Sequence, residues 1–246
     1  MELKNKIVLV TGSSRGIGKA IALLFAKKGA KVIVNYSKSE KEADEVVNEI
    51  KKTSDGISIK CDVSDEKQVK SMIEKIVKKY GGLDILVNNA GKYIDGDEWN
   101  GSSEIWRETL SQNLISAMNT SKCATQIFMK QKSGTIVNIA SRHSVSGKYD
   151  ALAYAASKAG IVSITQAYSK LLAPFGRANC VSPGATRAGY WLNAPKEELE
   201  EIISKMHKKR LIEPEEIANV VLFLASSESA GITGKNIIVD DEKNVK

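Results

Sequence analysis

Short runs of apolar residues alternate along the chain with longer segments in which apolar side chains recur every three or four positions. The short runs predict strands buried on both faces, and the periodic segments predict amphipathic helices. The predicted strands cover residues 6–11, 31–36, 57–62, 84–88, 134–140, 177–182 and 236–240. The predicted helices follow Gly18 to Lys28 and cover 39–52, 65–80, 102–131, 153–173 and 214–226. This alternation indicates right-handed crossovers and an α/β fold, with a doubly wound parallel sheet of about seven strands and helices on both faces.

One segment, 184–208, departs from this alternation. It contains Tyr190 and Trp191 and then an acidic amphipathic helix, Lys196–Met206. An excursion between a strand and the next helix is where a substrate lid would lie, although its aromatic residues could equally pack against the body as a surface segment. No linker, repeat or low-complexity tract interrupts the chain, so we expect a single domain over residues 1–246.

The composition is that of a soluble globular protein, with 42% hydrophobic and 26% charged residues. No apolar run approaches the ~20 residues that span a bilayer, and the start runs directly into a strand pattern without signal-peptide features. The cysteines Cys61, Cys123 and Cys180 are scattered. They indicate reduced core residues in a cytoplasmic protein that has neither a disulfide framework nor a zinc site.

The net charge of +7 comes from scattered lysines rather than from a cluster. Nucleic-acid binding would require clustered Arg and Lys with interleaved aromatic residues, and no such cluster is present. The lysines therefore indicate a solvated surface, whose positive field would also attract anionic ligands.

A glycine-rich loop, Thr11-Gly-Ser-Ser-Arg-Gly-Ile-Gly18, joins the first predicted strand to the first helix. Glycines in this setting allow a tight turn and let backbone N–H groups approach a pyrophosphate at the positive end of the helix. A helix start that simply needs small residues would look similar, but the strand-loop-helix context favours a dinucleotide site.

The end of the second strand carries information on the cofactor. Sites for NAD usually have an acidic residue about 20 residues after the loop, which binds the ribose hydroxyls. Here the strand ends Asn35-Tyr36-Ser37-Lys38, and the first carboxylate is Glu40. A missing carboxylate, together with the cations of Arg15 and Lys38, predicts a 2′-phosphate and hence NADP(H) in preference to NAD(H).

Tyr154 and Lys158 lie four residues apart in an alanine-rich run that predicts a helix continuing to Leu172. This spacing places the phenol and the ammonium on one helical face. A free tyrosine titrates near pH ~10, and a nearby lysine cation favours the phenolate, so Tyr154 could act as a general acid or base. Alone the pair is a weak signal, because this spacing also occurs on solvated helical faces.

Further polar and small residues lie after the predicted strands. Ligands of doubly wound sheets bind at the carboxyl ends of the strands, so these residues belong to one edge of the sheet and favour a functional Tyr154–Lys158 pair. The residues at this edge are Asp62, Val63, Asn88, Asn89, Ala90, Gly91 and Ser141, and Asn113 lies in the long helix that follows Gly91.

These features together resemble the short-chain dehydrogenase/reductase family over essentially the whole chain. The matching motifs are Thr11-Gly-x-x-x-Gly-x-Gly18, Asn88-Asn-Ala-Gly91, Ser141 with Tyr154-x-x-x-Lys158, and Pro183-Gly184. The resemblance implies a catalytic set of Asn113, Ser141, Tyr154 and Lys158, a Rossmann fold and a homo-tetramer built on the helices at 102–131 and 153–173. The cofactor residues expected from it and from the loop are Gly12, Ser14, Arg15, Gly16, Ile17, Gly18, Asn35, Tyr36, Ser37, Asp62, Val63, Asn89, Ala90, Gly91, Tyr154, Lys158, Pro183, Gly184 and Thr186.

The roles follow from the chemistry of these side chains. Tyr154 would give a proton to a carbonyl oxygen as hydride arrives from the nicotinamide, or take one in reverse. Ser141 would hydrogen-bond the same oxygen. Lys158 would lower the phenol pKa and hold the nicotinamide ribose, and the resemblance assigns to Asn113 the positioning of a water that connects this lysine to solvent. No metal is implied, because no set of ligands has suitable spacing.

The sequence looks most like the 3-oxoacyl-(acyl-carrier-protein) reductase group, but it departs from that group at three places. Lys92-Tyr93-Ile94-Asp95 replaces the usual Thr-Arg-Asp run, Ala188 replaces a Thr, and Asp240-Asp241-Glu242 replaces a terminal Asp-Gly-Gly. These differences bear on the carrier-protein substrate and on subunit contacts rather than on hydride transfer.

Two alternatives to a ketoreductase therefore remain. A sugar or polyol dehydrogenase could use His143 and Trp191 for polar and stacking contacts, although His143 could also be an ordinary loop histidine. A non-catalytic NADP(H)-binding redox sensor would have no need of the intact proton relay. The substrate-side residues are predicted to be Ser141, His143, Tyr154, Tyr190 and Trp191.

Overall fold

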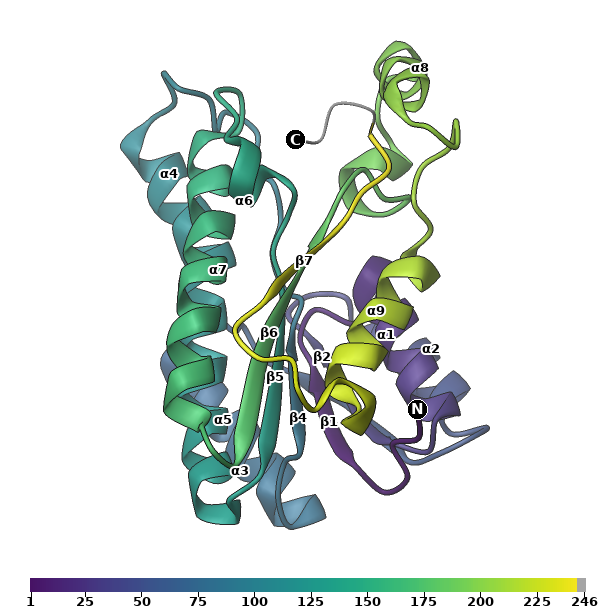
Figure 1. Cartoon of the computed structure of the whole chain (residues 1–246), viewed down its shortest axis with the longest axis vertical. Coiled ribbons are helices and arrows are strands. Elements are labelled where there is room, and N and C mark those ends of the chain that lie inside the picture. The colour runs from purple at the N-terminus through teal and green to yellow at the C-terminus, as the bar shows by residue number, and fades with distance from the viewer. Residues whose placement is uncertain (243–246) are drawn as a thin grey trace.

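The computed structural model describes residues 1–242 and is built around a parallel sheet of seven strands in the order β3-β2-β1-β4-β5-β6-β7 (Figure 1). The strands are β1 (Ile7–Val10), β2 (Lys31–Tyr36), β3 (Gly56–Lys60), β4 (Ile85–Asn88), β5 (Gly134–Ile139), β6 (Gly176–Pro183) and β7 (Asn236–Val239). All six neighbouring pairs are parallel. The predicted strands and the predicted α/β class are confirmed, with strand ends that move by no more than about two residues.

Helices cover both faces of this sheet (Figure 1). One layer holds α1 (Gly16–Lys27), α2 (Glu40–Ile50) and α9 (Pro214–Ala225), and the other holds α3 (Glu66–Tyr80), α5 (Ser116–Gln131) and α7 (Leu152–Leu172). The shorter elements are α4 (Ser103–Leu110), α6 (His143–Ser146), α8 (Lys196–Lys205), the π turn η1 (Ser111–Ile115), and the 3₁₀ turns η2 (Gly189–Leu192) and η3 (Ser227–Ser229).

Two cores result, because successive side chains of a strand point to opposite faces. In β1, Val8 and Val10 belong to the core beneath α1 and α9, whereas Leu9 belongs to the core beneath α3 and α5. All three side chains are fully buried. This burial on both faces explains why the strands are continuous apolar runs rather than alternating ones.

The long helix predicted over 102–131 is the clearest difference from expectation. The structure divides it into α4, the π turn η1 and α5. Hydrophobic periodicity cannot show a single wide turn, because the apolar stripe continues on either side of it. Asn113 lies within that turn, so the local widening occurs at a residue expected to be functional.

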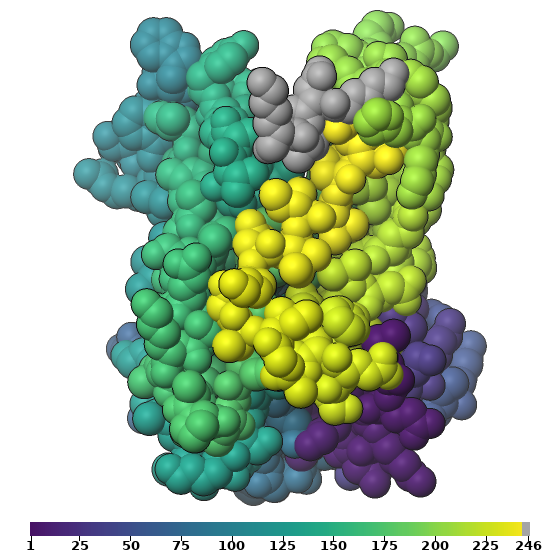
Figure 2. Space-filling view, in the orientation of Figure 1, coloured from purple at the N-terminus to yellow at the C-terminus, as the bar shows by residue number. Residues whose placement is uncertain are grey.

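From β1 the sheet grows outward through β2 and β3 on one side. β4 then pairs with the other side of β1, so the direction of growth reverses between β1 and β4. Ligand sites of doubly wound sheets form at such a reversal, beyond the carboxyl ends of the strands. Segments around α4 and α6 rise on one side of this edge, and the segment of α8 rises on the other (Figures 1 and 2). Across residues 1–242, none of the helices combines the length and apolar character needed to cross a bilayer.

Candidate active site

The glycine loop between β1 and α1 is held against the end of β4. The Thr11 hydroxyl accepts hydrogen bonds from the backbone N–H groups of Asn89 and Ala90 at 3.0 and 2.9 Å. In return, the Asn89 side-chain amide donates to the carbonyl oxygens of Thr11 and Gly12 at 2.9 and 3.0 Å. These reciprocal bonds join the two strands that flank the reversal and set the shape of the loop.

Two glycines of the loop have no room for a side chain. A Cβ on Gly12, whose φ is +60°, would lie 2.9 Å from Ala90 Cα, and one on Gly18 would lie 2.5 Å from Asn89 Nδ2. The N-terminus of α1, which begins at Gly16 between them, has no side-chain cap and no acidic residue in its first turn. Its N–H groups and its positive end therefore suit a pyrophosphate.

A cleft opens from this loop along the ends of β2, β3 and β4. Its lining residues are Gly12, Ser14, Arg15, Asn35, Tyr36, Ser37, Lys38, Ser39, Cys61, Asp62, Val63, Asn89, Ala90, Gly91, Lys92 and Gln112. Most of the residues expected at the cofactor are thus brought to one cleft. The expected residues that do not line it are Gly16, Ile17, Gly18, Tyr154, Lys158, Pro183, Gly184 and Thr186.

Asn35 supports the cleft from behind rather than offering its amide to a ligand. Its Oδ1 accepts from the Gly12 N–H at 3.1 Å, and its Nδ2 donates to the Cys61 carbonyl oxygen at 3.0 Å. The residue is 1% exposed. Both polar ends of its side chain are therefore used within the protein, which makes it a brace for the glycine loop.

Of the other residues at the end of β2, Tyr36 is buried within the protein, whereas Ser37 and Lys38 are exposed to solvent. Burial raises the pKa of the Tyr36 phenol, and its hydrogen bond to Glu40 and the negative charge of that carboxylate raise it further. The first carboxylate after β2 is thus engaged by a buried phenol. Ser37, Lys38 and Arg15 are exposed at the cleft.

At the end of β3, Asp62 forms a small turn that lies beside the cleft. Its Oδ1 accepts from the backbone N–H and the hydroxyl of Ser64 at 2.9 and 2.7 Å. The amide of Asn119, on α5, donates to the Val63 carbonyl oxygen at 3.2 Å and so holds this turn from the helix layer. Asp62 and Val63 therefore line the cleft at the end of β3.

Tyr154 and Lys158, in the first turns of α7, meet Ser141 beyond the end of β5. The Ser141 and Tyr154 hydroxyls are hydrogen-bonded to each other. Lys158 Nζ donates to the Ile139 carbonyl oxygen at 3.1 Å and lies 5.5 Å from the centre of the Tyr154 ring. Ser141 and Lys158 are both buried. The predicted spacing has therefore brought the hydroxyl, the phenol and the ammonium together.

The acidities of these groups differ from the expectation that Lys158 lowers the phenol pKa. Burial raises the pKa of Tyr154, against a smaller lowering by the hydrogen bond to Ser141. Burial also lowers the pKa of Lys158 to about 8. In this structure desolvation thus dominates the acidity of the phenol, and Tyr154 holds its proton at neutral pH.

Asn113 lies fully buried behind this group, in the π turn η1. Its Oδ1 accepts from the Lys92 N–H at 3.1 Å, and its Nδ2 donates to the carbonyl oxygens of Lys92 and Thr109 at 2.8 and 2.9 Å. A Cβ on Gly91 would lie 2.5 Å from Asn113 Oδ1 and 3.2 Å from Lys158 Nζ. Gly91 therefore lets the motif at the end of β4 pass between these two side chains.

Comparison with known proteins identifies the family of the chain. A family model described as enoyl-(acyl carrier protein) reductase matches residues 12–241. The 3-oxoacyl-(acyl-carrier-protein) reductase FabG of Thermotoga maritima is 38% identical over 246 residues, which cover 98% of each chain. The protein of the same name from Staphylococcus aureus is 37% identical over 237 residues, or 96% of each chain. The chain belongs to the short-chain dehydrogenase/reductase family.

Solved structures give the same placement. A protein of Sinorhizobium meliloti 1021 described as a short-chain alcohol dehydrogenase superposes with a TM-score of 0.91 at 32% identity, covering 98% of this chain and 96% of that one. Levodione reductase superposes with a TM-score of 0.91 at 28% identity, covering 97% of each chain. This member of the family is therefore an oxidoreductase with a Rossmann fold and a nicotinamide cofactor.

Beside Tyr154, the structure adds a residue that the sequence did not mark as part of the site. Tyr93 packs edge-on against Tyr154 with ring centres 6.4 Å apart and against Tyr190 at 6.3 Å, and Tyr190 packs against Trp191 at 5.3 Å. The Tyr190 hydroxyl also hydrogen-bonds Glu198 on α8. The aromatic residues of the segment 184–208 are thereby linked to Tyr154, a connection that no local pattern reveals.

His143 lies at the start of α6, two residues after Ser141, and not in an open loop. Its backbone N–H donates to the Ser141 hydroxyl at 3.2 Å, and its ring Nδ1 lies 3.4 Å from Ser146 Oγ. Burial lowers the pKa of His143 to about 4, helped by the positive charges of Lys148 and Arg142. The imidazole is therefore neutral at physiological pH.

The end of β6 supports the site from the other side. The Thr186 hydroxyl donates to the Gly184 carbonyl oxygen at 2.9 Å. A Cβ on Gly184 would lie 2.1 Å from Asp240 Oδ1, and Asp240 also pairs with Arg142, the residue after Ser141, at 3.1 Å. Arg142 forms a second ion pair with Glu242. Asp240 and Glu242, which stand in the segment that departs from a terminal Asp-Gly-Gly, thus brace the loop that carries Ser141.

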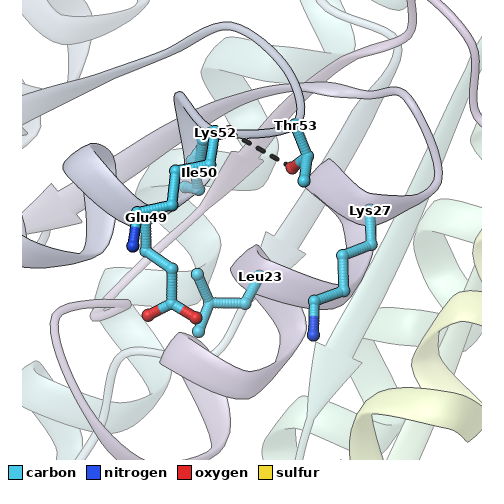
Figure 3. A pocket seen from close by; sticks show the side chains of 6 residues that line it. All are labelled: Leu23, Lys27, Glu49, Ile50, Lys52 and Thr53. Atoms are coloured by element: carbon cyan, nitrogen blue, oxygen red, sulfur yellow. Dashed lines mark hydrogen bonds between the residues drawn. The ribbon is translucent and has the colours of Figure 1, made fainter.

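A second hollow lies away from this edge, between the last turns of α1 and α2 (Figure 3). It is lined by Leu23, Lys27, Glu49, Ile50, Lys52 and Thr53. Helices of a parallel sheet run against the strands, so this hollow lies at the amino ends of the strands, away from the cofactor edge. Within residues 1–242, no three His, Cys, Asp or Glu side chains are grouped to hold a metal ion, and the three cysteines are buried and free.

Proposed function

We propose that this chain is an NADP(H)-dependent ketoreductase that acts on a 3-oxoacyl thioester. The observation that carries the proposal is the meeting of Tyr154, Ser141 and Lys158 beside a glycine-loop cleft at the carboxyl edge of the sheet. The substrate class comes from the Thermotoga maritima and Staphylococcus aureus relatives, whose names specify reduction of a 3-oxoacyl group on acyl carrier protein.

The chain's own residues suit the proton half of such a reduction. Tyr154 holds its proton at neutral pH, because burial raises the phenol pKa, and so it can give that proton to a carbonyl oxygen. Ser141, hydrogen-bonded to the phenol, can donate to the same oxygen and stabilise the developing negative charge. When bound, the nicotinamide supplies the hydride for the carbonyl carbon.

Lys158 and Asn113 support these two hydroxyls from the buried side. Lys158 is anchored on the Ile139 carbonyl oxygen, which leaves two of its ammonium hydrogens for the cofactor ribose or for water. Asn113 Oδ1 accepts one hydrogen bond, from the Lys92 N–H, and can accept a second. The pair is thus suited to the water relay that the family resemblance implies.

The preference for NADP(H) rests on the charges around the end of β2. Arg15 and Lys38 line the cleft with exposed side chains, whereas Glu40 is engaged by Tyr36. Two exposed cations at the end of β2 and in the glycine loop suit a 2′-phosphate.

A homo-tetramer is supported by apolar side chains left exposed on the outer helices. Ile115, at the end of η1, and Met118, on α5, are 41% and 40% exposed, and Leu152 and Leu171 on α7 are 42% and 49% exposed. Apolar surface on neighbouring helices is typical of a subunit interface. We place the enzyme in the cytoplasm, as expected from its reduced, buried cysteines.

The test is NADPH oxidation by the purified protein with an acetoacetyl thioester, with Tyr154→Phe as control. We expect turnover that the variant loses, and a lower KM for NADPH than for NADH. A protein that reduces NADP⁺ with sugars or polyols but ignores the thioester would instead be a sugar or polyol dehydrogenase. Tight NADPH binding without turnover in either assay would indicate a redox sensor and refute the proposal.

A further inference from the structure

Asp97 is a fully buried carboxylate between β4 and α4, outside all the motifs that mark the active site. Its Oδ1 accepts from the Ala153 N–H at 2.9 Å, and its Oδ2 accepts from the Tyr154 N–H at 2.7 Å. Its backbone carbonyl oxygen accepts from the Leu152 N–H at 2.7 Å. One residue thus takes three N–H groups in the first turn of α7, the turn that carries Tyr154.

This helix cannot cap itself. The first N–H groups of any α-helix lack partners within the helix, and the N-cap residue of α7 is Ala151, which has no side-chain acceptor. The first turn of α7 also contains no acidic residue. The cap therefore comes from a residue 56 positions earlier in the chain. A carboxylate at the positive end of a 21-residue helix makes stronger hydrogen bonds than a neutral cap would.

The same segment holds the approach to α7 at two more points. The Trp99 N–H donates to the Tyr149 carbonyl oxygen at 2.8 Å, and the Tyr93 hydroxyl donates to the Asp150 carbonyl oxygen at 3.2 Å. These bonds hold the segment after β4 against the residues that precede α7. Within this segment, Asp97 is the residue that binds the backbone of Tyr154 itself.

We propose that Asp97 is a positioning residue that holds the backbone of Tyr154, so that its phenol stays at Ser141 and can deliver a proton. The inference rests on the proposed function, in which Tyr154 is the proton donor. Proton transfer requires placement to a fraction of an ångström, and a shift of about 1 Å can cost about a hundredfold in rate. An anchor on the N–H of the donor residue controls that placement directly.

The test compares three variants under conditions where each is folded. Asp97→Asn keeps the size of the side chain but turns one acceptor into an NH₂ group, so it loses one of the two bonds. Asp97→Ala loses both. Asp97→Ala combined with Ala151→Asp returns a carboxylate from the helix's own N-cap, whose side chain normally reaches the second and third N–H groups, here those of Ala153 and Tyr154.

We expect kcat to fall about tenfold in Asp97→Asn and about a hundredfold in Asp97→Ala, with the Kd for NADPH and the KM for the ketone within about twofold. The double variant should recover most of the loss. Ile76→Ala, which opens a cavity in the core beneath α3 and α5, is the control for lost stability and should lower Tm but not kcat.

Other results would overturn the proposal. Folded Asp97→Asn and Asp97→Ala proteins with kcat within about twofold of the parent would do so, as would a folded double variant that stays as slow as Asp97→Ala. An Asp97→Asn protein that cannot fold and bind NADPH would assign Asp97 to the fold alone and would also overturn it.

Amide hydrogen exchange separates this inference from the proposed function. We expect exchange at Ala153 and Tyr154 to be about tenfold faster in Asp97→Ala, slower again in the double variant, and unchanged in α3. If the variants show this pattern of exchange but the parent protein has no turnover, the proposed function is refuted and the anchoring role of Asp97 stands. Turnover of Asp97→Ala equal to the parent refutes the anchor and keeps the function.

Discussion

Lys158 Nζ lies 5.5 Å from the centre of the Tyr154 ring and donates a hydrogen bond to the Ile139 carbonyl oxygen at 3.1 Å. Because Ile139 ends the strand that leads to Ser141, this bond ties α7 to β5 at the point where the two hydroxyls meet. The ammonium is buried and has little water around it, which is why its pKa falls to about 8. Lys158 thus ties α7 to β5 and is also a cation whose pKa lies close to neutral pH.

Replacing Tyr154 with Phe should remove the proton donor while leaving the cleft for the cofactor in place. We expect kcat for carbonyl reduction to fall by about 10²–10⁴-fold, the usual range for a lost general acid. The Kd for NADPH should stay within about twofold, because the phenol oxygen is only one of many contacts. Steady-state kinetics and fluorescence titration measure the two quantities, and retained turnover would contradict the role of Tyr154.

The burial of Lys158 should make stability depend on pH. Its pKa is about 8 in the folded protein and 10.5 ordinarily. Between these values the unfolded chain binds the extra proton, so the free energy of unfolding should rise with pH across this window, by roughly 3 kcal/mol for this group. Below about pH 8 both states carry the charge and the contribution is constant.

Lys158→Met isolates this term in urea unfolding from about pH 7 to about pH 10. The buried thiol of Cys61, whose pKa burial raises to about 12, acts in the opposite direction but is present in both proteins. The difference between parent and variant should therefore favour the parent increasingly as pH rises through the window. A difference that does not change with pH would contradict the lowered pKa.

The sheet and the cofactor edge could be predicted from sequence because their signals are local. Val8, Leu9 and Val10 form a continuous apolar run only because helices cover both faces of their strand. The glycines of the loop were informative for the same reason, since Gly12 and Gly18 must be small where two strands meet.

The remaining features depend on contacts between distant segments. Tyr93 and Asp97 lie in an irregular stretch after β4, and only the folded chain brings them to Tyr154. The spacing of Tyr154 and Lys158 predicted proximity correctly but gave the wrong direction for the phenol pKa. Spacing contains no information on how deeply a group is buried, and here burial dominates.

The cofactor preference should change with charge at the end of β2. Ser37→Asp places a carboxylate where sites for NAD usually have one, so it should repel a 2′-phosphate and accept ribose hydroxyls. Lys38→Ala should remove one partner of that phosphate. We expect each change to raise the KM for NADPH by about tenfold or more, a loss of about 1.4 kcal/mol, while the KM for NADH falls in Ser37→Asp and is unchanged in Lys38→Ala.

The matched control for lost positive charge is Lys27→Ala, because Lys27 is an exposed lysine that lines the hollow between α1 and α2 (Figure 3). Its KM values should equal those of the parent. If the ratio of the KM values for NADPH and NADH is unchanged in both Ser37→Asp and Lys38→Ala, the 2′-phosphate does not bind at the end of β2.

Gly91 should tolerate no side chain, because a methyl group there would lie 2.5 Å from Asn113 Oδ1 and 3.2 Å from Lys158 Nζ. Either Asn113 must leave its hydrogen bonds to Lys92, or the chain after β4 must shift. We therefore expect Gly91→Ala to lower kcat/KM by about a hundredfold, since positions of reacting groups shifted by about 1 Å cost that much. Gly231→Ala is the matched control, because a Cβ there meets nothing within 4 Å. Parent-like kcat/KM in Gly91→Ala would show that Asn113 and Lys158 do not need their present separation.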